Sequence, residues 1–191
     1  MKKLIIAAFT LLLATIACAR PYAIAKGGAQ FSNFGVDDSE SLFGIRGGVG
    51  GFFPLGESSF CLMPQLIYAQ KGQESGSLLE KCKIHYAEVP LTIGAFIKFT
   101  RNIGLGLMVG PYAAYGVAGE MKSEYHNEKL FDLINRFDAG ISGGIQFHVW
   151  KLFVFADYDW GLKNILKKNE EYGIDDTMST RSGSVGIGFC Y

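Results

Sequence analysis

Apolar and polar side chains alternate along most of the chain, and this period of two predicts β-strands rather than helices. Strands of globular proteins are usually about 5–6 residues long, whereas a tilted strand needs about 9–11 residues to cross a bilayer. The alternating runs are 11 to 16 residues long, which favours membrane-spanning strands. There are eight of them, at residues 22–32, 42–53, 59–70, 82–97, 102–117, 137–149, 152–162 and 180–191.

The segments between these runs are alternately short turns and long polar loops. Short turns at one end and long loops at the other are typical of outer-membrane barrels, with the turns in the periplasm. We therefore predict an all-β chain that forms an eight-stranded antiparallel up-and-down transmembrane β-barrel. The short turns are residues 54–58, 98–101 and 150–151, and the long loops are residues 33–41, 71–81, 118–136 and 163–179.

Aromatic residues gather at two heights of the predicted barrel. Such belts mark the two membrane–water interfaces of a barrel, and they favour a membrane protein over a soluble sandwich. The predicted belt at the turn end contains Phe53, Phe60, Phe99, Phe147, Trp150, Phe153, Phe189 and Tyr191. The predicted belt at the loop end contains Phe31, Phe34, Phe43, Tyr68, Tyr86, Tyr115, Phe137, Tyr158 and Trp160.

The two faces of each run differ in size and polarity. Within residues 85–96, for example, Val89 and Ile93 alternate with Glu88 and Thr92. A soluble barrel would point its large apolar side chains inward, but the opposite face, of glycine, serine and charged residues, suits a lumen better. We therefore expect the apolar face to contact lipid. Side chains can fill the interior of an eight-stranded barrel, which predicts a polar, plugged interior.

A polar network is predicted in this lumen, because buried charges are stable only when they are paired and hydrogen-bonded. We expect Glu88 to pair with Lys26 or Arg46. The network is either a plug that fixes the shape and register of the barrel, which we favour, or a proton or ion path. Its predicted members are Lys26, Gln30, Arg46, Gln65, Glu88, Thr92, Asp138, Gln146, Asp157 and Asp159.

Pro90 lies in the middle of a predicted strand, where its missing N–H cannot join the ladder. A closed barrel has no edge strand to shelter a proline, so we predict a strand bulge or local bend at Pro90. Pro64 and Pro111 lie in the neighbouring strands. We expect the distortion to continue through them.

Residues 1–19 have the three parts of a signal peptide, namely basic residues, an apolar run and a small-residue cleavage site. We predict cleavage between Ala19 and Arg20, which leaves a barrel domain of residues 20–191. Lipidation of Cys18 stays open as an alternative. Without Lys2 and Lys3 the chain keeps 16 of its 18 basic residues against 18 acidic ones, a net charge of −2. This charge balance gives no basis for nucleic acid binding.

The sequence predicts no cofactor, no metal site and no enzymatic activity. Its three histidines, His85, His126 and His148, do not have the spacing of metal ligands. For the alternative of a lipid-modifying barrel enzyme, the candidate group is His126 with Glu124 or Glu128. A second alternative, a soluble lipocalin-like ligand carrier, would need an apolar interior.

Five stretches match the motifs of a known family, in order, along nearly the whole chain beyond residue 19. They are MPQLIYAQKG (63–72), HYAEVPLTIGAF (85–96), VGPYAAYGV (109–117), DYDWGLKNI (157–165) and SVGIGFCY (184–191). Together they resemble the PorT-like outer-membrane β-barrel family of Gram-negative bacteria, although Gln65 stands where that family usually has glutamate. The resemblance implies the fold and an outer-membrane location. Because the founding member is linked to protein secretion, it also implies, as an alternative function, an accessory role in a secretion system.

Taken together, these patterns predict a porin-like envelope protein of the Gram-negative outer membrane. We expect a structural or surface-binding role, carried by the long extracellular loops. The expected partners are outer-membrane lipids, the envelope barrel-assembly machinery, and an extracellular ligand or protein that binds residues 118–136 and 163–179.

Overall fold

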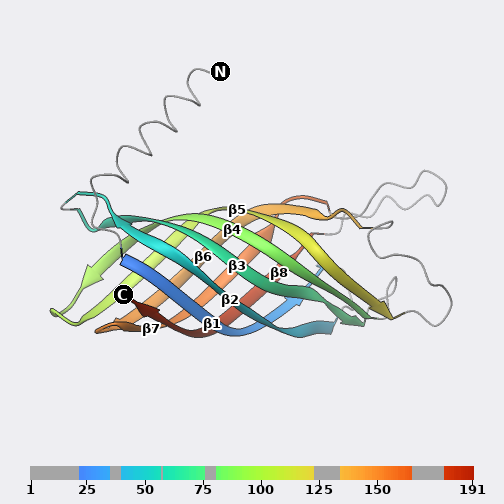
Figure 1. The fold of residues 1–191 in the computed structure, drawn as a ribbon, viewed down its shortest axis with the longest axis horizontal. Helices are drawn as coiled ribbons and strands as arrows, with labels where there is room; N and C mark the ends of the chain where they lie inside the picture. The colour runs from blue at the N-terminus through green and yellow to red at the C-terminus, as the bar shows by residue number, and fades with distance from the viewer. Residues whose placement is uncertain (1–21, 35–39, 57, 76–80, 123–133, 165–178) are drawn as a thin grey trace, which may run out of the picture.

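The strands of the protein form one closed antiparallel barrel. The computed structural model describes residues 22–34, 40–56, 58–75, 81–122, 134–164 and 179–191. The strands are β1 (Tyr22–Asn33), β2 (Glu40–Pro54), β3 (Phe60–Ser75), β4 (Lys81–Lys98), β5 (Ile103–Lys122), β6 (Phe137–Val149), β7 (Leu152–Gly161) and β8 (Arg181–Cys190). Each strand pairs with its neighbours in sequence, and β8 pairs with β1 to close the barrel (Figure 1). The predicted eight-stranded up-and-down order is confirmed.

Some of the predicted features lie outside the described residues. These are the signal peptide, its cleavage site at Ala19 and Arg20, and the loop group of His126, Glu124 and Glu128. Within the part of the chain that the structure describes, no helix is long and apolar enough to cross a membrane.

Two strands continue further toward the loop end than the sequence predicted. β3 runs to Ser75 and β5 to Lys122. The β3–β4 ladder remains paired as far as Gln73 and Cys82, and the β4–β5 ladder as far as Lys122 and Lys81. The predicted starts of loops at residues 71 and 118 are therefore wrong. Backbone pairing with β4 holds both segments extended.

The outer surface of the barrel is a broad apolar face. Val89 is 52% exposed and Ile187 is 68% exposed, whereas Glu88 beside Val89 is fully buried. Large apolar side chains therefore point away from the lumen, as predicted for a lipid-facing surface. The soluble lipocalin-like alternative, which requires the opposite orientation, is wrong.

The prolines interrupt the ladders without shifting them. Between Pro64 and Ile67 the β3–β4 ladder omits two pairs and resumes in the same register, and the β4–β5 ladder does the same after Pro90. The register shift in the β4–β5 ladder lies instead between His85 and Tyr86. The predicted bulge at Pro90 is therefore wrong, because the ladders on both sides of β4 lose pairs near Pro90 without a change of register. The local bend, the other form of the prediction, stays a prediction.

Most residues of the two predicted aromatic belts point outward, but three do not. Phe34, Tyr86 and Phe153 are almost completely buried in the barrel interior. Tyr86 shares the inward parity of Glu88 on β4, and Phe153 shares that of Phe155 on β7. Parity along the strand therefore decides whether a ring faces lipid, and height along the strand alone does not.

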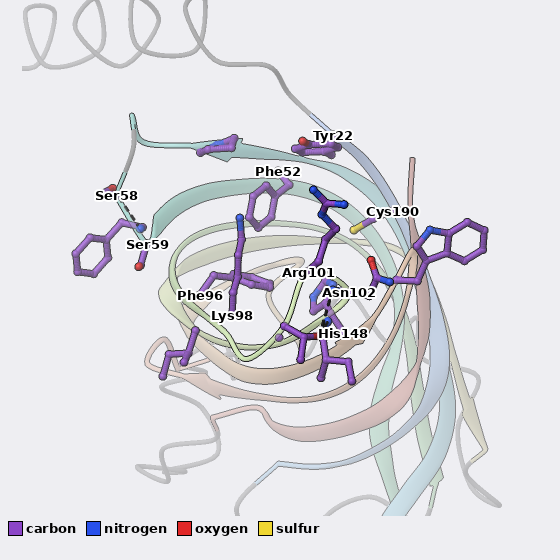
Figure 2. Close-up of a pocket in the computed structure, with 17 residues that line it drawn as sticks. Tyr22, Phe52, Ser58, Ser59, Phe96, Lys98, Arg101, Asn102, His148 and Cys190 are labelled. Atoms are coloured by element: carbon purple, nitrogen blue, oxygen red, sulfur yellow. Dashed lines mark hydrogen bonds between the residues drawn. The ribbon is translucent and has the colours of Figure 1, made fainter.

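The turn end of the barrel has an open hollow, which lies at the same end as the C terminus (Figures 1 and 2). The cavity has a volume of about 740 Å³ and is bordered by the β2–β3, β4–β5 and β6–β7 turns. Further inside, Ile24, Cys61, Met63 and Met108 form a buried apolar cluster. The rings of Phe52 and Phe96 pack against it and separate the hollow from the middle of the lumen.

Candidate functional site

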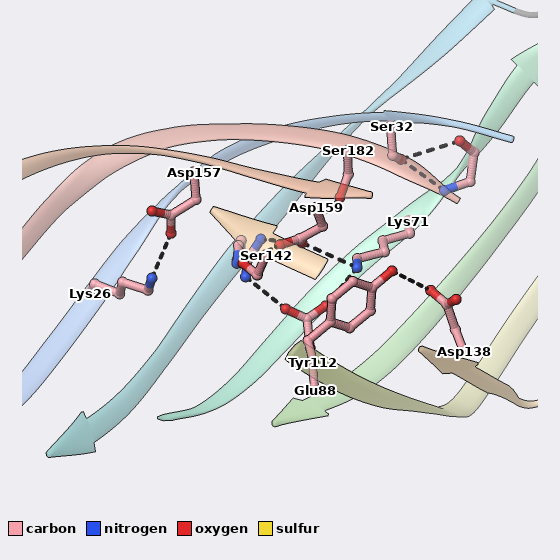
Figure 3. A network of polar contacts seen from close by, with 12 residues as sticks. Lys26, Ser32, Lys71, Glu88, Tyr112, Asp138, Ser142, Asp157, Asp159 and Ser182 are labelled. Atoms are coloured by element: carbon pink, nitrogen blue, oxygen red, sulfur yellow. Dashed lines mark hydrogen bonds and ion pairs between the residues drawn. The ribbon is translucent and has the colours of Figure 1, made fainter. Parts of the chain in front are cut away.

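Four charged side chains meet in the lumen, each carried by a different strand (Figure 3). Arg46 of β2 donates to Glu88 of β4 over 2.7 Å and to Asp159 of β7 over 2.5 Å. Lys71 of β3 lies between the same carboxylates, with Nζ 2.6 Å from Glu88 Oε2 and 3.2 Å from Asp159 Oδ2. Each cation therefore contacts both carboxylates. We refer to Arg46, Lys71, Glu88 and Asp159 as the central ion cluster.

Neutral groups add hydrogen bonds and a ring contact to this cluster, although Arg46 Nε has no hydrogen-bond partner among the described residues. Ser142 Oγ donates to Asp159 Oδ1 over 2.6 Å, and Ser182 Oγ donates to Asp159 Oδ2 over 3.3 Å. The ring of Tyr112 lies 4.5 Å from the ammonium of Lys71, a favourable cation–π distance. Buried charges lose their hydration, so these additional partners offset part of that cost.

Two further polar contacts lie beside the cluster. Lys26 Nζ is 2.6 Å from Asp157 Oδ2 and 4.9 Å from the centre of the Phe155 ring. Tyr112 donates its hydroxyl to Asp138 Oδ2 over 3.0 Å. The described lumen thus holds three buried cations and four buried carboxylates, and Asp138 is the carboxylate that takes a hydroxyl instead of a cation.

The structure places all of the predicted network residues inside the barrel. Each is at most 7% exposed, and the set is Lys26, Gln30, Arg46, Gln65, Glu88, Thr92, Asp138, Gln146, Asp157 and Asp159. Glu88 pairs with Arg46, one of its two expected partners, whereas the other, Lys26, pairs with Asp157.

The uncharged members of the predicted network lie apart from the ion pairs. Thr92 donates to the Met63 carbonyl over 3.4 Å, and Gln146 Oε1 lies 3.0 Å from His148 Nε2. Gln30 and Gln65 are buried on the inner face of their strands but contact none of the ion-paired groups by a described hydrogen bond. The network is therefore smaller than the predicted set.

Lys71 is a central member of this cluster that is absent from the predicted network, because the sequence analysis predicts a loop at residues 71–81. It is fully buried and bridges both carboxylates of the central ion cluster. The signal was present in the sequence, since Gln65, Ala69, Lys71 and Gln73 share one parity along the strand. Continuing the period of two beyond residue 70 would have placed its side chain in the lumen.

This arrangement suits a structural plug better than a path for ions or protons. The central ion cluster binds β2, β3, β4 and β7 to one another across the lumen. Toward the turn end, the apolar cluster of Ile24, Cys61, Met63 and Met108 contains no ionisable side chain other than a thiol. The described residues contain no group of three or more His, Cys, Asp or Glu side chains placed to hold a metal ion.

The model of a family described as "Outer membrane protein beta-barrel domain" matches residues 25–167 of the chain. The chain belongs to this family. The barrel is accordingly an outer-membrane protein of a Gram-negative bacterium, as predicted. A comparison with curated proteins found no match.

Solved structures of small outer-membrane barrels are similar to this one. Neisserial surface protein A (NspA) has a TM-score of 0.52 and 9% identity over 89% of this chain and 95% of its own. Ail, the attachment invasion locus protein of Yersinia pestis, has a TM-score of 0.48 and 11% identity over 91% and 99%. The N-terminal barrel of Pseudomonas aeruginosa OprF has a TM-score of 0.46 and 12% identity over 91% and 98%. At such low identity the likeness to NspA concerns the fold alone.

Proposed function

We propose that the barrel is a non-conducting, non-enzymatic envelope protein that acts through the surface it exposes outside the cell. The observation that carries this proposal is the filling of its lumen. Short turns of outer-membrane barrels lie in the periplasm, so we place the hollow at the turn end there and call it the periplasmic hollow. The central ion cluster occupies the interior, and the apolar cluster of Ile24, Cys61, Met63 and Met108 lies between it and the periplasmic hollow. Because the lumen of the barrel is filled in this way, the two ends of the barrel are the places where it can bind other molecules outside the membrane.

The energetics of the lumen support a permanent plug. A path for ions would require the buried pairs to separate, and uncompensated buried charges are costly. Arg46 and Lys71 each contact two carboxylates, so displacing either cation breaks two ion pairs at once. We therefore expect no steady conductance through the folded barrel.

Planar bilayer recording tests this part of the proposal. The purified barrel should give no stable current steps under conditions in which a large water-filled porin, used as the positive control, conducts. A paired variant, Arg46→Ala with Glu88→Ala, removes two large side chains from the lumen and serves as the opened reference. Steady, salt-dependent conductance of the unaltered protein would refute the plug.

Surface binding is proposed for residues 118–136 and 163–179, which include the charged stretches EYHNEK and KKNEEYGIDD. The test compares whole cells that display the unaltered barrel with cells in which residues 123–133 of the first segment or 165–178 of the second are replaced by a short glycine–serine linker. These replacements keep β5, which runs to Lys122, and the hydrogen bond from the Gly116 amide to the Arg136 carbonyl. Loss of binding to a host or bacterial surface with one replacement, at equal barrel abundance, is the expected result. Equal binding by all three strains would exclude these segments as the binding surface.

The resemblance to PorT-like barrels supports a second candidate, an accessory role in protein secretion. Two of its motifs contain Lys71 and Glu88, whose side chains here lie in the central ion cluster. The side chains at those positions therefore stabilise the barrel. The motifs are thus better evidence for the fold than for a role in secretion. Comparison of the secreted proteins of a deletion strain with those of its parent separates the two roles.

Export by the signal peptide is part of the same proposal. We expect the mature chain to begin at Arg20, after cleavage that follows Ala19, and N-terminal mass spectrometry of the protein from membranes measures this directly. A mature N terminus at a lipid-modified Cys18 would overturn it.

A further inference from the structure

The periplasmic hollow is a candidate binding site that is separate from the central ion cluster. Its volume of about 740 Å³ falls in the range of about 300–1,000 Å³ that is typical of small-molecule sites. The apolar cluster with Phe52 and Phe96 closes it toward the membrane interior. The hollow is therefore open to the periplasm at one end and has an apolar floor.

Aromatic rings form one wall of this hollow and hold one another in place. Phe52 and Phe96 pack edge to face with centroids 5.1 Å apart, and Phe96 packs in the same way on His148 at 4.7 Å. Tyr22 extends the row, with its ring 6.2 Å from that of Phe52. Rings fixed in this geometry present edges and faces on which a flat apolar ligand can pack.

The charged residues that line the hollow are, in the part of the chain that the structure describes, all of one sign. Among the described lining residues, Lys98 and Arg101 carry charge and no carboxylate does. Both belong to the β4–β5 turn, and in Figure 2 their side chains extend to the same side of the hollow, toward Phe52. An ammonium and a guanidinium above an aromatic wall fit an anion with an apolar body, because a guanidinium presents a planar fork to a carboxylate.

Hydrogen bonds between the turns fix the rim that carries these cations. The Phe96 amide donates to the Ser59 carbonyl over 2.7 Å and joins β4 to the β2–β3 turn. The Trp150 amide donates to the Asn102 carbonyl over 2.6 Å and joins the β6–β7 turn to the β4–β5 turn. Within the latter, the Ile103 amide donates to Thr100 Oγ1 over 3.1 Å. A rim ordered in this way needs little rearrangement to bind a ligand.

We propose that the periplasmic mouth of the barrel binds small aryl carboxylates. The carboxylate lies between Lys98 and Arg101, and the aromatic body packs against Phe52 and Phe96. This site is independent of the proposed surface role of the extracellular segments. It requires neither movement of the central ion cluster nor passage through the lumen.

Cys190 provides a reporter for occupancy of this site. It is a free, half-buried thiol that lines the hollow (Figure 2), whereas the other described cysteines, Cys61 and Cys82, are buried. The full barrel in lipid nanodiscs is treated with N-ethylmaleimide, and the rate of Cys190 labelling is followed by mass spectrometry. The probe is 2-naphthoate, with neutral 2-naphthamide and inorganic phosphate as matched partial ligands. Saturation-transfer NMR of the naphthoate protons gives a second readout that needs no thiol.

The expected result is saturable protection of Cys190 by 2-naphthoate, with weaker protection by 2-naphthamide and by phosphate. Replacing Lys98 and Arg101 together by glutamine should raise the half-protecting concentration roughly fivefold to tenfold, since each exposed charge pair contributes a factor of a few. Lys151→Gln is the control, because Lys151 is a cation of the same barrel end that does not line the hollow. Heat-modifiable migration on gels verifies that every variant is folded.

Three results would overturn the proposal. One is the absence of both protection and saturation transfer with 2-naphthoate. Another is binding of 2-naphthamide that equals the binding of 2-naphthoate, which would show that the hollow is an apolar cleft that does not recognise an anion. The third is an equal loss of binding in Lys151→Gln, which would indicate attraction by general surface charge.

Discussion

Removing the charge of Glu88 tests most directly whether the central ion cluster stabilises the barrel. Glu88 is fully buried, with Arg46 Nη2 2.7 Å and Lys71 Nζ 2.6 Å from its two carboxylate oxygens. Glu88→Gln keeps the size of the side chain but leaves two buried cations to share Asp159. We expect the free energy of unfolding to fall by about 3–5 kcal/mol, the usual cost of removing one partner from a buried pair.

A second substitution distinguishes ion pairing from a simple loss of packing. Lys71→Met removes the other member of one pair and, on its own, should cost a similar amount. In the double variant, Arg46 and Asp159 remain as one balanced pair, so the costs should not add. We expect a coupling energy of about 2–3 kcal/mol, within the range found for residues in direct contact.

The measurement is urea-induced unfolding of the refolded barrel in lipid vesicles, followed by tryptophan fluorescence and by gel migration. Combining Lys71→Met with Thr92→Val provides the control cycle, because the Thr92 hydroxyl bonds to the Met63 carbonyl and not to Lys71. That cycle should be additive to within about 0.5 kcal/mol. Equal additivity of the Glu88 and Lys71 substitutions would show that the cluster is not an energetic unit.

Two further predictions concern the lipid face and the closing seam. Ile145→Arg, on the outer face of β6 and opposite Ala156 of β7, should cost about 2–4 kcal/mol, against about 0–1 for Leu152→Arg near the interface; equal costs in vesicle unfolding would contradict the placement of the bilayer. Gly28→Ala should impair folding, because its Cβ would lie 2.1 Å from the Val185 carbonyl oxygen, whereas Gly27→Ala, with 3.8 Å to its nearest neighbour, should be tolerated. Comparable folding yields of these two variants would refute the claim of close backbone approach.

The strand count, the order and the lipid face could be read from the sequence because they depend on local patterns. A period of two sets which side chains share a face, and run length sets what a strand can span. The same rule separates Val89 from Glu88 and places Asp157 and Asp159 on the inner face of β7. These assignments need no knowledge of which strands are neighbours.

The partners of the buried charges could not be read in the same way. Lys26 of β1 meets Asp157 of β7 because β8 closes the barrel between them, in the register that aligns Lys26 with Gly188 and Asp157 with Ser184. A contact between such distant strands depends on the stagger of all the strands around the barrel. This stagger cannot be read from any one alternating run. Pro90 illustrates the same limit, since its effect depended on whether the flanking ladders could resume in register.

The distribution of polarity along the lumen bears on where this protein acts. Ion pairs and hydroxyls fill the middle, whereas Ile24, Met63, Met108 and neighbouring rings fill the interior next to the periplasmic hollow. Water entering from the periplasm would pass Lys98 and Arg101 at the mouth and would then meet this apolar layer before it reached the central ion cluster. Substitutions in the lumen should therefore change stability and leave binding intact, while substitutions at Lys98 or Arg101 should change binding at the mouth and leave stability nearly intact. A lumen variant that keeps full stability but loses binding at the surface or at the mouth would contradict this separation. It would indicate that the interior of the barrel takes part directly in function.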